Sequence, residues 1–336
     1  MSIFEPEDTS LGRWRLAIRH ETALRYDGPV RASYNELRMT PLDTAAQTTL
    51  ASRVEVSPEA PTWNYTDYWG TRVTSFDLQD PHEALTIRAT SVVETSPSTW
   101  AEAGQADEAD RVVRAIEAGQ EAEAPDPDTA AADADAVQKR REEDKASGHE
   151  TWEAIDRMIQ TGDLAEFTAP TARTKLTPAL QAELRERVAG AGPHTAAERI
   201  SSWIHEAMSY VPGATGVHTS GREAWESKSG VCQDFSHIAI GMLRAAGLPA
   251  RYVSGYLFPL KESTPGVSCE GQSHAWTEYW AGEWYGLDAT NNVAPGLRHV
   301  VVGYGREYSD VVPHKGIYLG SPDSTLMVSV KLTRLA

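Results

Sequence analysis

Three residues in the second half of the chain carry side chains suited to cysteine-based acyl chemistry: Cys232, His274 and Asp288. A thiolate can attack a carbonyl carbon, an imidazole can move the proton, and a carboxylate can hold that imidazole in one orientation. Cys232 is one of two cysteines in 336 residues, which is too few for a disulfide framework. The elements around the three residues therefore decide whether these side chains meet.

The residues that follow Cys232 predict an amphipathic helix. Apolar residues recur there at the spacing of one buried helix face: Phe235, Ile238, Ala239, Met242 and Leu243. Cys232 would occupy the first turn, where unpaired N–H groups and the positive end of the helix dipole favour a thiolate. Gly230 permits a close backbone approach, and the dipole also favours an anion at Asp234. A buried structural cysteine at a helix start would show the same pattern, so both interpretations stay open.

His274 and Asp288 fall on two segments that predict a β-hairpin. HAWTEYW alternates, Ala281 and Gly282 supply a turn, and EWYGLDAT alternates back. With a three-residue loop centred on Ala281, His274 lies directly opposite Asp288, within reach of a carboxylate–imidazole contact. A two-residue loop would shift the pairing by one residue and place the two side chains on opposite faces.

The remaining cysteine and a nearby histidine fit structural roles better. His237 lies five residues after Cys232 and is expected to pack or to face solvent, and Cys269 is expected as a spare thiol in the loop SCEGQS. A structural zinc site needs four ligands, and neither residue is placed to complete one. The chain also lacks a His-Glu-x-x-His motif, a P-loop and a Gly-x-Gly-x-x-Gly fingerprint. We therefore expect no metal and no cofactor.

The net charge of −17 disfavours nucleic acid and anionic membranes as partners, because both require a basic surface. The N-terminal residues show no basic segment followed by an apolar one, and no stretch reaches the roughly 18 apolar residues that span a bilayer. We therefore expect a cytoplasmic protein without membrane contact.

An acidic insert divides the sequence. Residues 101–150 hold 15 acidic and 6 basic side chains, which predicts a solvated loop, partly helical or disordered. A calcium site there is disfavoured, because DPDTAAADAD lacks the spacing of an EF-hand loop. Before the insert, alternating segments predict an antiparallel β-sandwich of about eighty residues. Its residues Tyr65, Tyr68 and Trp69 serve as packing or, alternatively, as a binding patch.

Helical patterns dominate after the insert. They lie near 151–161 and 178–189, between Thr195 and Tyr210, and in GREAWESKSG. Thr195 and Glu198 fit a capping box for the third of these helices.

Two later segments read as strands, residues 299–313 and 325–332, and we expect them to complete an antiparallel sheet packed on the Cys232 helix. The predicted fold class is α+β. We divide the chain into a sandwich over 1–96, the insert with a helical linker over 97–194, and a mixed domain over 195–336.

Four motifs resemble bacterial transglutaminase-like proteins: GVCQDF at 230–235, GLPARYVSGY at 247–256, SHAW at 273–276 and DATNN at 288–292. The resemblance covers about 195–330, and the strands of 14–95 resemble the N-terminal domain that accompanies this core. It implies a papain-like core, in which a nucleophile helix packs on an antiparallel sheet. It also implies that Cys232 is the nucleophile, His274 the general base and acid, and Asp288 the orienting carboxylate. The acidic insert departs from the compact family pattern.

The expected function is hydrolysis of an amide or peptide bond in a peptide or protein substrate, through a thioester. Hydrolysis is favoured because water is always present, while transglutaminase-type transfer to an amine and a non-catalytic protein-binding module remain alternatives. The backbone N–H of Cys232 is a candidate oxyanion donor. Side-chain candidates for oxyanion or substrate contact are Tyr210, Trp203, Gln233 and Trp276. The sequence leaves the oligomeric state open.

Overall fold

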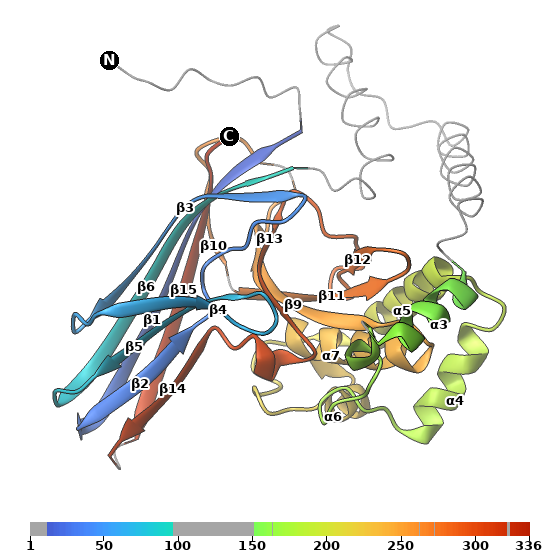
Figure 1. Cartoon of the computed structure of the whole chain (residues 1–336), viewed down its shortest axis with the longest axis horizontal. Coiled ribbons are helices and arrows are strands. Elements are labelled where there is room, and N and C mark those ends of the chain that lie inside the picture. The colour runs from blue at the N-terminus through green and yellow to red at the C-terminus, as the bar shows by residue number, and fades with distance from the viewer. Residues whose placement is uncertain (1–11, 97–150, 163, 262, 272, 321–322) are drawn as a thin grey trace, which may run out of the picture.

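The computed structural model describes residues 12–96, 151–162, 164–261, 263–271, 273–320 and 323–336. The predicted acidic insert lies outside the described residues. In Figure 1 a half built of long strands lies beside a half in which helices pack on a shorter sheet. The predicted α+β fold class is confirmed.

Two antiparallel sheets form the β-rich half. One has the strand order β10-β15-β1-β6-β3 and the other has the order β14-β2-β5-β4. Their strands are β1 (Trp14–Val30), β2 (Ala32–Leu37), β3 (Gln47–Ser57), β4 (Thr62–Thr66), β5 (Arg72–Leu78), β6 (His82–Thr95), β10 (Ser268–Gly271), β14 (His314–Leu319) and β15 (Ser324–Arg334). Alternate apolar side chains of β1 and β6, such as Leu16 and Ile87, are buried, as the period of two predicts.

The last strand differs from its prediction. Residues 325–332 belong to β15, which pairs with β1 and β10 in the sandwich and not with the sheet beneath the Cys232 helix. Burial explains this placement, because Val330 and Leu332 lie in one core cluster with Leu16 and Ile18. The sandwich therefore takes strands from both ends of the chain. The domain boundaries at 96 and 194 stay a prediction.

The second half has a four-stranded sheet of order β12-β11-β9-β13. The strand predicted over 299–313 joins this sheet as β13 but ends at Gly305, and a 3-10 helix follows it. The elements of this half are α3 (Trp152–Thr161), η2 (Ala165–Phe167), α4 (Pro178–Arg187), α5 (Pro193–Ala207), β7 (Ser209–Tyr210), α6 (Gly221–Ser227), β8 (Ser229–Gly230), α7 (Cys232–Ala245), β9 (Ala250–Leu257), β11 (Ser273–Trp280), β12 (Trp284–Leu287) and β13 (His299–Gly305), followed by η3 (Tyr308–Asp310). Among the described residues, no helix combines the length and the apolarity needed to cross a bilayer.

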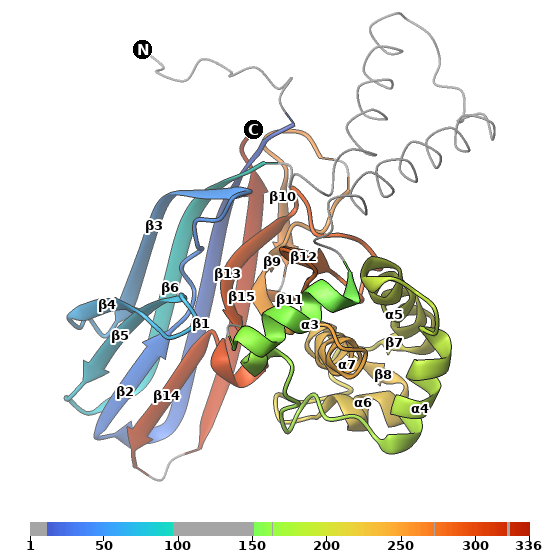
Figure 2. The ribbon, with the colours of Figure 1, turned by 45° about the vertical axis from the view of Figure 1, so that its right-hand side comes forward.

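Helix α7 is central, not one-faced as its sequence predicts. Residues 233–244 are all buried, because α4, α5 and α6 pack around the helix and strands β9 and β11 cover the rest. Figure 2 shows α7 almost end-on inside this arrangement. The buried Arg244 donates hydrogen bonds to the backbone carbonyls of Ala250 and Ala169, which satisfies its charge-bearing donors. The surroundings thus fix α7 on every side.

The predicted capping box of α5 is wrong. The helix begins at Pro193, whose fixed φ suits the first position, so Thr195 lies inside the first turn and its side chain caps nothing. The helix also ends before Tyr210, because β7 pairs in parallel with β8 and sets Tyr210 beside Gly230. This short pairing brings the end of α5 to the residues that precede Cys232.

Contacts at the turn between β4 and β5 join the two halves. The Tyr68 hydroxyl donates to Glu166 at 3.2 Å, and the Trp69 ring centroid lies 5.9 Å from that of Phe167. Both partners belong to η2. Of the two roles considered for these aromatic residues, packing therefore describes Trp69, whereas the Tyr68 side chain is 78 % exposed.

Candidate active site

Cys232 is the first residue of α7, as the sequence predicts, and it is partly exposed. The backbone ahead of it is held by Asp234, whose Oδ2 accepts the N–H of Val231 at 2.8 Å and the Thr215 hydroxyl at 2.5 Å. A Cβ on Gly230 would lie 2.7 Å from the same Oδ2, so glycine makes this close approach possible. Burial raises the pKa of Asp234, although both hydrogen bonds oppose that shift.

His274 lies near the start of β11 and meets Asp288 directly after β12. Its Nε2 is 2.8 Å from Asp288 Oδ2, which leaves Nδ1 for the thiol of Cys232. Burial lowers the pKa of His274, but hydrogen bonds to Asp288 and Cys232 outweigh burial and raise it to about 10. The imidazolium is therefore the stable form at neutral pH. The structure thus brings the three sequence-predicted residues together.

The hairpin that carries His274 and Asp288 differs in register from the prediction. Trp280 pairs with Trp284, so the three-residue loop is centred on Gly282, which has φ 93, and not on Ala281. Glycine adopts positive φ without steric cost, so the turn forms there. The pairing shifts by two residues, which keeps the face and makes Asp288 diagonal to His274.

Asp288 has further partners that the sequence analysis missed. Its Oδ2 also faces His299 Nε2 at 3.2 Å and accepts the Asn291 side-chain amide at 2.7 Å. Its Oδ1 accepts the backbone N–H groups of Thr290 and Asn291. Burial raises the pKa of Asp288, but the bonds to His274 and His299 outweigh burial and hold it well below the usual range. Asn291 belongs to the motif DATNN, from which a role near Asp288 could have been inferred. His299 is the first residue of β13, and no motif around it indicates a contact with Asp288.

The cluster of His274, Asp288 and His299 has donor atoms within 4.8 Å of one another, as a metal site requires. The Nδ1 of His299, however, accepts the backbone N–H of Gly296 at 3.2 Å, so Nε2 carries the proton. A metal ligand would need a free lone pair on Nε2. Binding would move the proton to Nδ1 and break the bond to Gly296. The residues present therefore fit a hydrogen-bonded cluster better than a metal centre.

The four side-chain candidates differ in placement. Tyr210 is 48 % exposed, and burial and then the nearby Cys232 raise its pKa. Gln233 follows Cys232 in α7 and is buried, as is Trp276. Trp203 packs edge to face on Trp225 in the helical core. Of these four residues, Tyr210 combines an exposed side chain with an electrostatic interaction with Cys232.

The ring of Trp276 packs against the imidazoles of both His274 and His299. Its ring stacks on His274 with centroids 6.0 Å apart, and it meets His299 edge to face at 5.2 Å. A fully buried ring in these contacts restricts both imidazoles.

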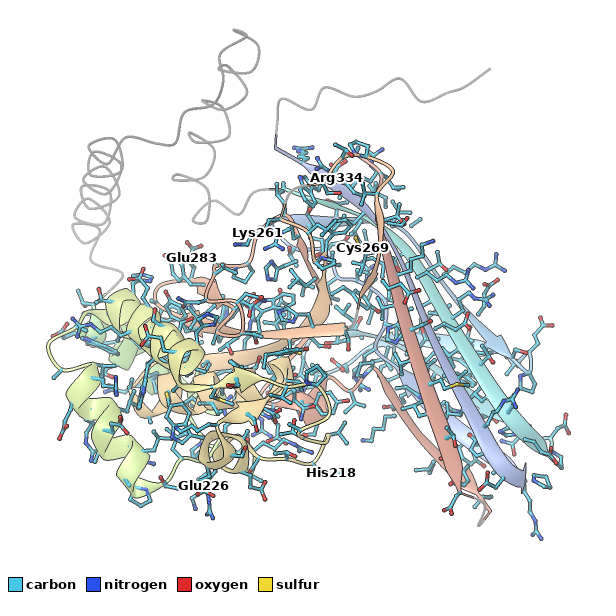
Figure 3. The ribbon with its side chains drawn as sticks, turned by 180° about the vertical axis from the view of Figure 1, so that it is seen from behind. His218, Glu226, Lys261, Cys269, Glu283 and Arg334 are labelled. Carbon is cyan, nitrogen blue, oxygen red and sulfur yellow. The ribbon has the colours of Figure 1, made fainter. Side chains whose placement is uncertain are left out.

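Two further residues have roles apart from the site chemistry. Cys269 lies in strand β10, opposite Leu332, and not in a loop as expected. Figure 3 shows it on the sandwich side near Arg334, away from His218 and Glu226. His237 is completely buried, its pKa is lowered to about 3 by burial, and its Nε2 accepts the N–H of Tyr308. It packs in the core, one of the two roles expected.

Two regions of the chain match known protein families. Residues 16–94 match the bacterial transglutaminase-like N-terminal region, and residues 182–289 match the transglutaminase-like superfamily. An uncharacterized protein of Mycobacterium leprae is 36 % identical over 96 % of this chain and all of its own length. A protein-glutamine gamma-glutamyltransferase of Pseudomonas aeruginosa is 33 % identical over 158 residues, which are 43 % of this chain and 23 % of that protein.

A solved structure shares the fold of nearly the whole chain. It is a protein of Cytophaga hutchinsonii provisionally named a cysteine protease, with a TM-score of 0.68 and 20 % identity over 97 % of this chain and 92 % of that one. The two matched family regions and the full-length relative confirm the resemblance that the sequence motifs indicated. The chain belongs to the transglutaminase-like superfamily and carries its bacterial N-terminal region.

Proposed function

We propose that the protein is a cysteine-dependent hydrolase of amide or peptide bonds in a peptide or protein substrate. The observation that carries the proposal is the buried 2.8 Å contact between His274 and Asp288, beside a cysteine at the start of α7. Membership of the transglutaminase-like superfamily supports the same cysteine-based chemistry.

The proposed reaction begins with the thiolate of Cys232, whose Sγ attacks the carbonyl carbon of the substrate. As the C–N bond breaks, the His274 imidazolium gives its proton to the leaving amine, and the acyl group stays on Sγ as a thioester. A water molecule then attacks the thioester and gives a proton to His274. The C–S bond breaks, the acid leaves, and the thiolate–imidazolium pair is restored. Asp288 keeps the imidazole oriented and balances its charge.

Oxyanion stabilisation is assigned to the backbone N–H of Cys232. First-turn N–H groups have no acceptor within their own helix, so this group is free to donate to the developing charge. Tyr210, half exposed beside Gly230, is the proposed side chain on the substrate side.

Transfer of the acyl group to an amine is the second candidate. In this case an amine replaces water and resolves the thioester into a new amide, while every residue keeps its role. The similarity to a protein-glutamine gamma-glutamyltransferase over 158 residues favours this outcome.

The test combines a quenched-peptide library with incorporation of a labelled amine. Wild type and the matched control Cys269→Ala are expected to turn over substrate, whereas Cys232→Ala is expected to lose all turnover and keep its thermal denaturation midpoint. Peptide cleavage supports hydrolysis, and amine incorporation supports transfer. Unchanged turnover in Cys232→Ala would refute the proposal, and wild type inert in both assays would favour the binding-module alternative.

A further inference from the structure

We infer that His299 is a positioning residue of this site, a second imidazole that holds the Asp288 carboxylate in place for His274. The inference rests on the proposed function and deepens it. His299 takes no direct part in the proposed proton transfer and acts through Asp288.

One carboxylate oxygen serves both imidazoles. Asp288 Oδ2 lies 2.8 Å from His274 Nε2 and 3.2 Å from His299 Nε2. Asp288 is completely buried and His299 is 6 % exposed, so water does not compete strongly for these bonds. A carboxylate that is held by a second donor on the same oxygen loses freedom to rotate away from His274.

The direction of the His299 bond is set by a turn of the backbone. The N–H of His299 donates to the carbonyl of Gly296 at 2.8 Å, and the N–H of Gly296 donates back to His299 Nδ1 at 3.2 Å. Because Nδ1 is an acceptor, the ring proton resides on Nε2 and faces Asp288. Any other tautomer would lose a bond at each end of the ring.

The charges around His299 are consistent with a neutral donor. Burial lowers the pKa of His299, the bond to Asp288 opposes that shift, and the nearby charges of His274 and Arg298 add to it. The ring centroids of the two histidines are 6.0 Å apart. A second imidazolium at this distance would repel that of His274, whereas a neutral N–H supports the carboxylate without that cost.

Three substitutions at His299 distinguish its hydrogen bond to Asp288 from its hydrogen bond to Gly296. His299→Leu removes both bonds. His299→Asn keeps an acceptor near the position of Nδ1 for Gly296 but is too short to reach Asp288. His299→Gln extends an amide N–H toward the position of Nε2. His314→Asn is the matched control, since His314 is a largely buried histidine bonded to Asn35 in the sandwich.

Two measurements report whether the His274 imidazole keeps its orientation toward Asp288 and Cys232. The first is the low-field proton resonance of the His274 Nε2–H bond to Asp288, assigned by its absence in His274→Gln. The second is the iodoacetamide alkylation rate of Cys232 divided by that of Cys269 at neutral pH. Because loosened packing would change both measurements as well, the comparison of His299→Asn with His299→Gln separates the hydrogen bond from packing, and thermal denaturation checks that each variant is folded.

His299→Asn is expected to lose the resonance and to slow relative alkylation about tenfold to a hundredfold, the effect of losing a hydrogen bond to a charged group. His299→Gln and His314→Asn are expected to stay within about threefold of wild type. If His299→Leu does not fold, the comparison of His299→Asn with His299→Gln tests the inference by itself. Retained resonance and alkylation in His299→Asn would overturn the inference. If the resonance depends on His299 in a protein without turnover, the inference stands and the proposed function fails.

Discussion

The carboxylate of Asp288 collects hydrogen bonds from two imidazoles, one side-chain amide and two backbone N–H groups. So many donors stabilise the ionised form and restrict rotation of the carboxylate. They come from β11, from the start of β13 and from the turn after β12. The orientation of His274 therefore depends on residues that take no part in the proposed proton transfer.

Alkylation of Cys232 tests whether His274 activates the thiol. His274→Ala removes the imidazolium that stabilises the thiolate, so the alkylation rate at neutral pH is expected to fall about tenfold to a hundredfold. Cys269, which lies in the sandwich, provides the reference in the same digest by mass spectrometry. Equal slowing of both cysteines, or of neither, contradicts an imidazole-activated thiol.

The pH dependence of stability follows from the same imidazole. The pKa of His274 is raised from 6.5 to about 10, so the folded chain retains a proton that the unfolded chain releases between these values. This stabilisation is fully present below about pH 6.5 and is lost as the pH rises through about 10.

Thermal denaturation of wild type and His274→Gln measures this contribution. The gap between their midpoints is expected to be largest near pH 6 and to shrink toward pH 10. A gap that stays constant over this range would mean that the two states bind the proton equally.

The sequence could predict that Cys232, His274 and Asp288 lie together, because acyl chemistry restricts the residue types and because a helix start and a hairpin have local signals. It could not identify His299 in this way. The contact of His299 with Asp288 depends on the Gly296 turn and on the pairing of β13 with β9. Neither feature follows from the residues beside His299 alone.

At the scale of elements, the β11–β12 hairpin shows what a short-range pattern can determine. Alternation fixes which residues share a face, so His274 and Asp288 were expected on one side. The exact pairing depends on which residue adopts positive φ, and Gly282 does so in place of Ala281. The predicted register was wrong by two residues. His274 and Asp288 still share one face, because a shift by an even number of residues leaves each side chain on its original face.

The start of α7 gives a prediction at this scale. Gly230→Ala would push a Cβ to 2.7 Å from Asp234 Oδ2 and displace the carboxylate from the N–H of Val231. The free energy of unfolding is expected to fall by about 1–3 kcal/mol, and alkylation of Cys232 is expected to slow. Urea denaturation and alkylation check this result. Gly216→Ala is the control, since a Cβ there meets nothing within 4 Å.

At the scale of the whole molecule, the sandwich is built from both ends of the chain. Strands β14 and β15 follow the half that carries Cys232 in the chain and return to pair with β2 and β1. Sequence patterning identified β15 as a strand but assigned it to the wrong sheet. Partner choice between two apolar sheets depends on long-range packing, which alternation within one segment does not encode.

A fragment of residues 151–336 tests this arrangement. Without β1 and β2, strands β14 and β15 would present unpaired edges that already carry exposed apolar side chains such as Ile317 and Leu326. We expect the fragment to aggregate in size-exclusion chromatography and co-expression with residues 1–150 to restore a soluble complex. A monodisperse fragment would show that the half that carries Cys232 folds without the sandwich.

The pairing of β1 with β15 also sets how the molecule bears tension. Leu16 lies opposite Arg334 and Tyr26 opposite Ser324, and the N–H of Arg15 bonds to the carbonyl of Ala336. A load that pulls residues 14 and 334 apart would open this ladder one rung at a time, because the force acts across the antiparallel strands and does not shear them together. Residues 330–333 of β15 also pair with β10, which precedes β11 in the chain, so part of this load would pass to the strand that carries His274. Under pulling from residues 14 and 334, the pairing of β1 with β15 would therefore open rung by rung, while β10 couples the same end of β15 to the half that carries the site.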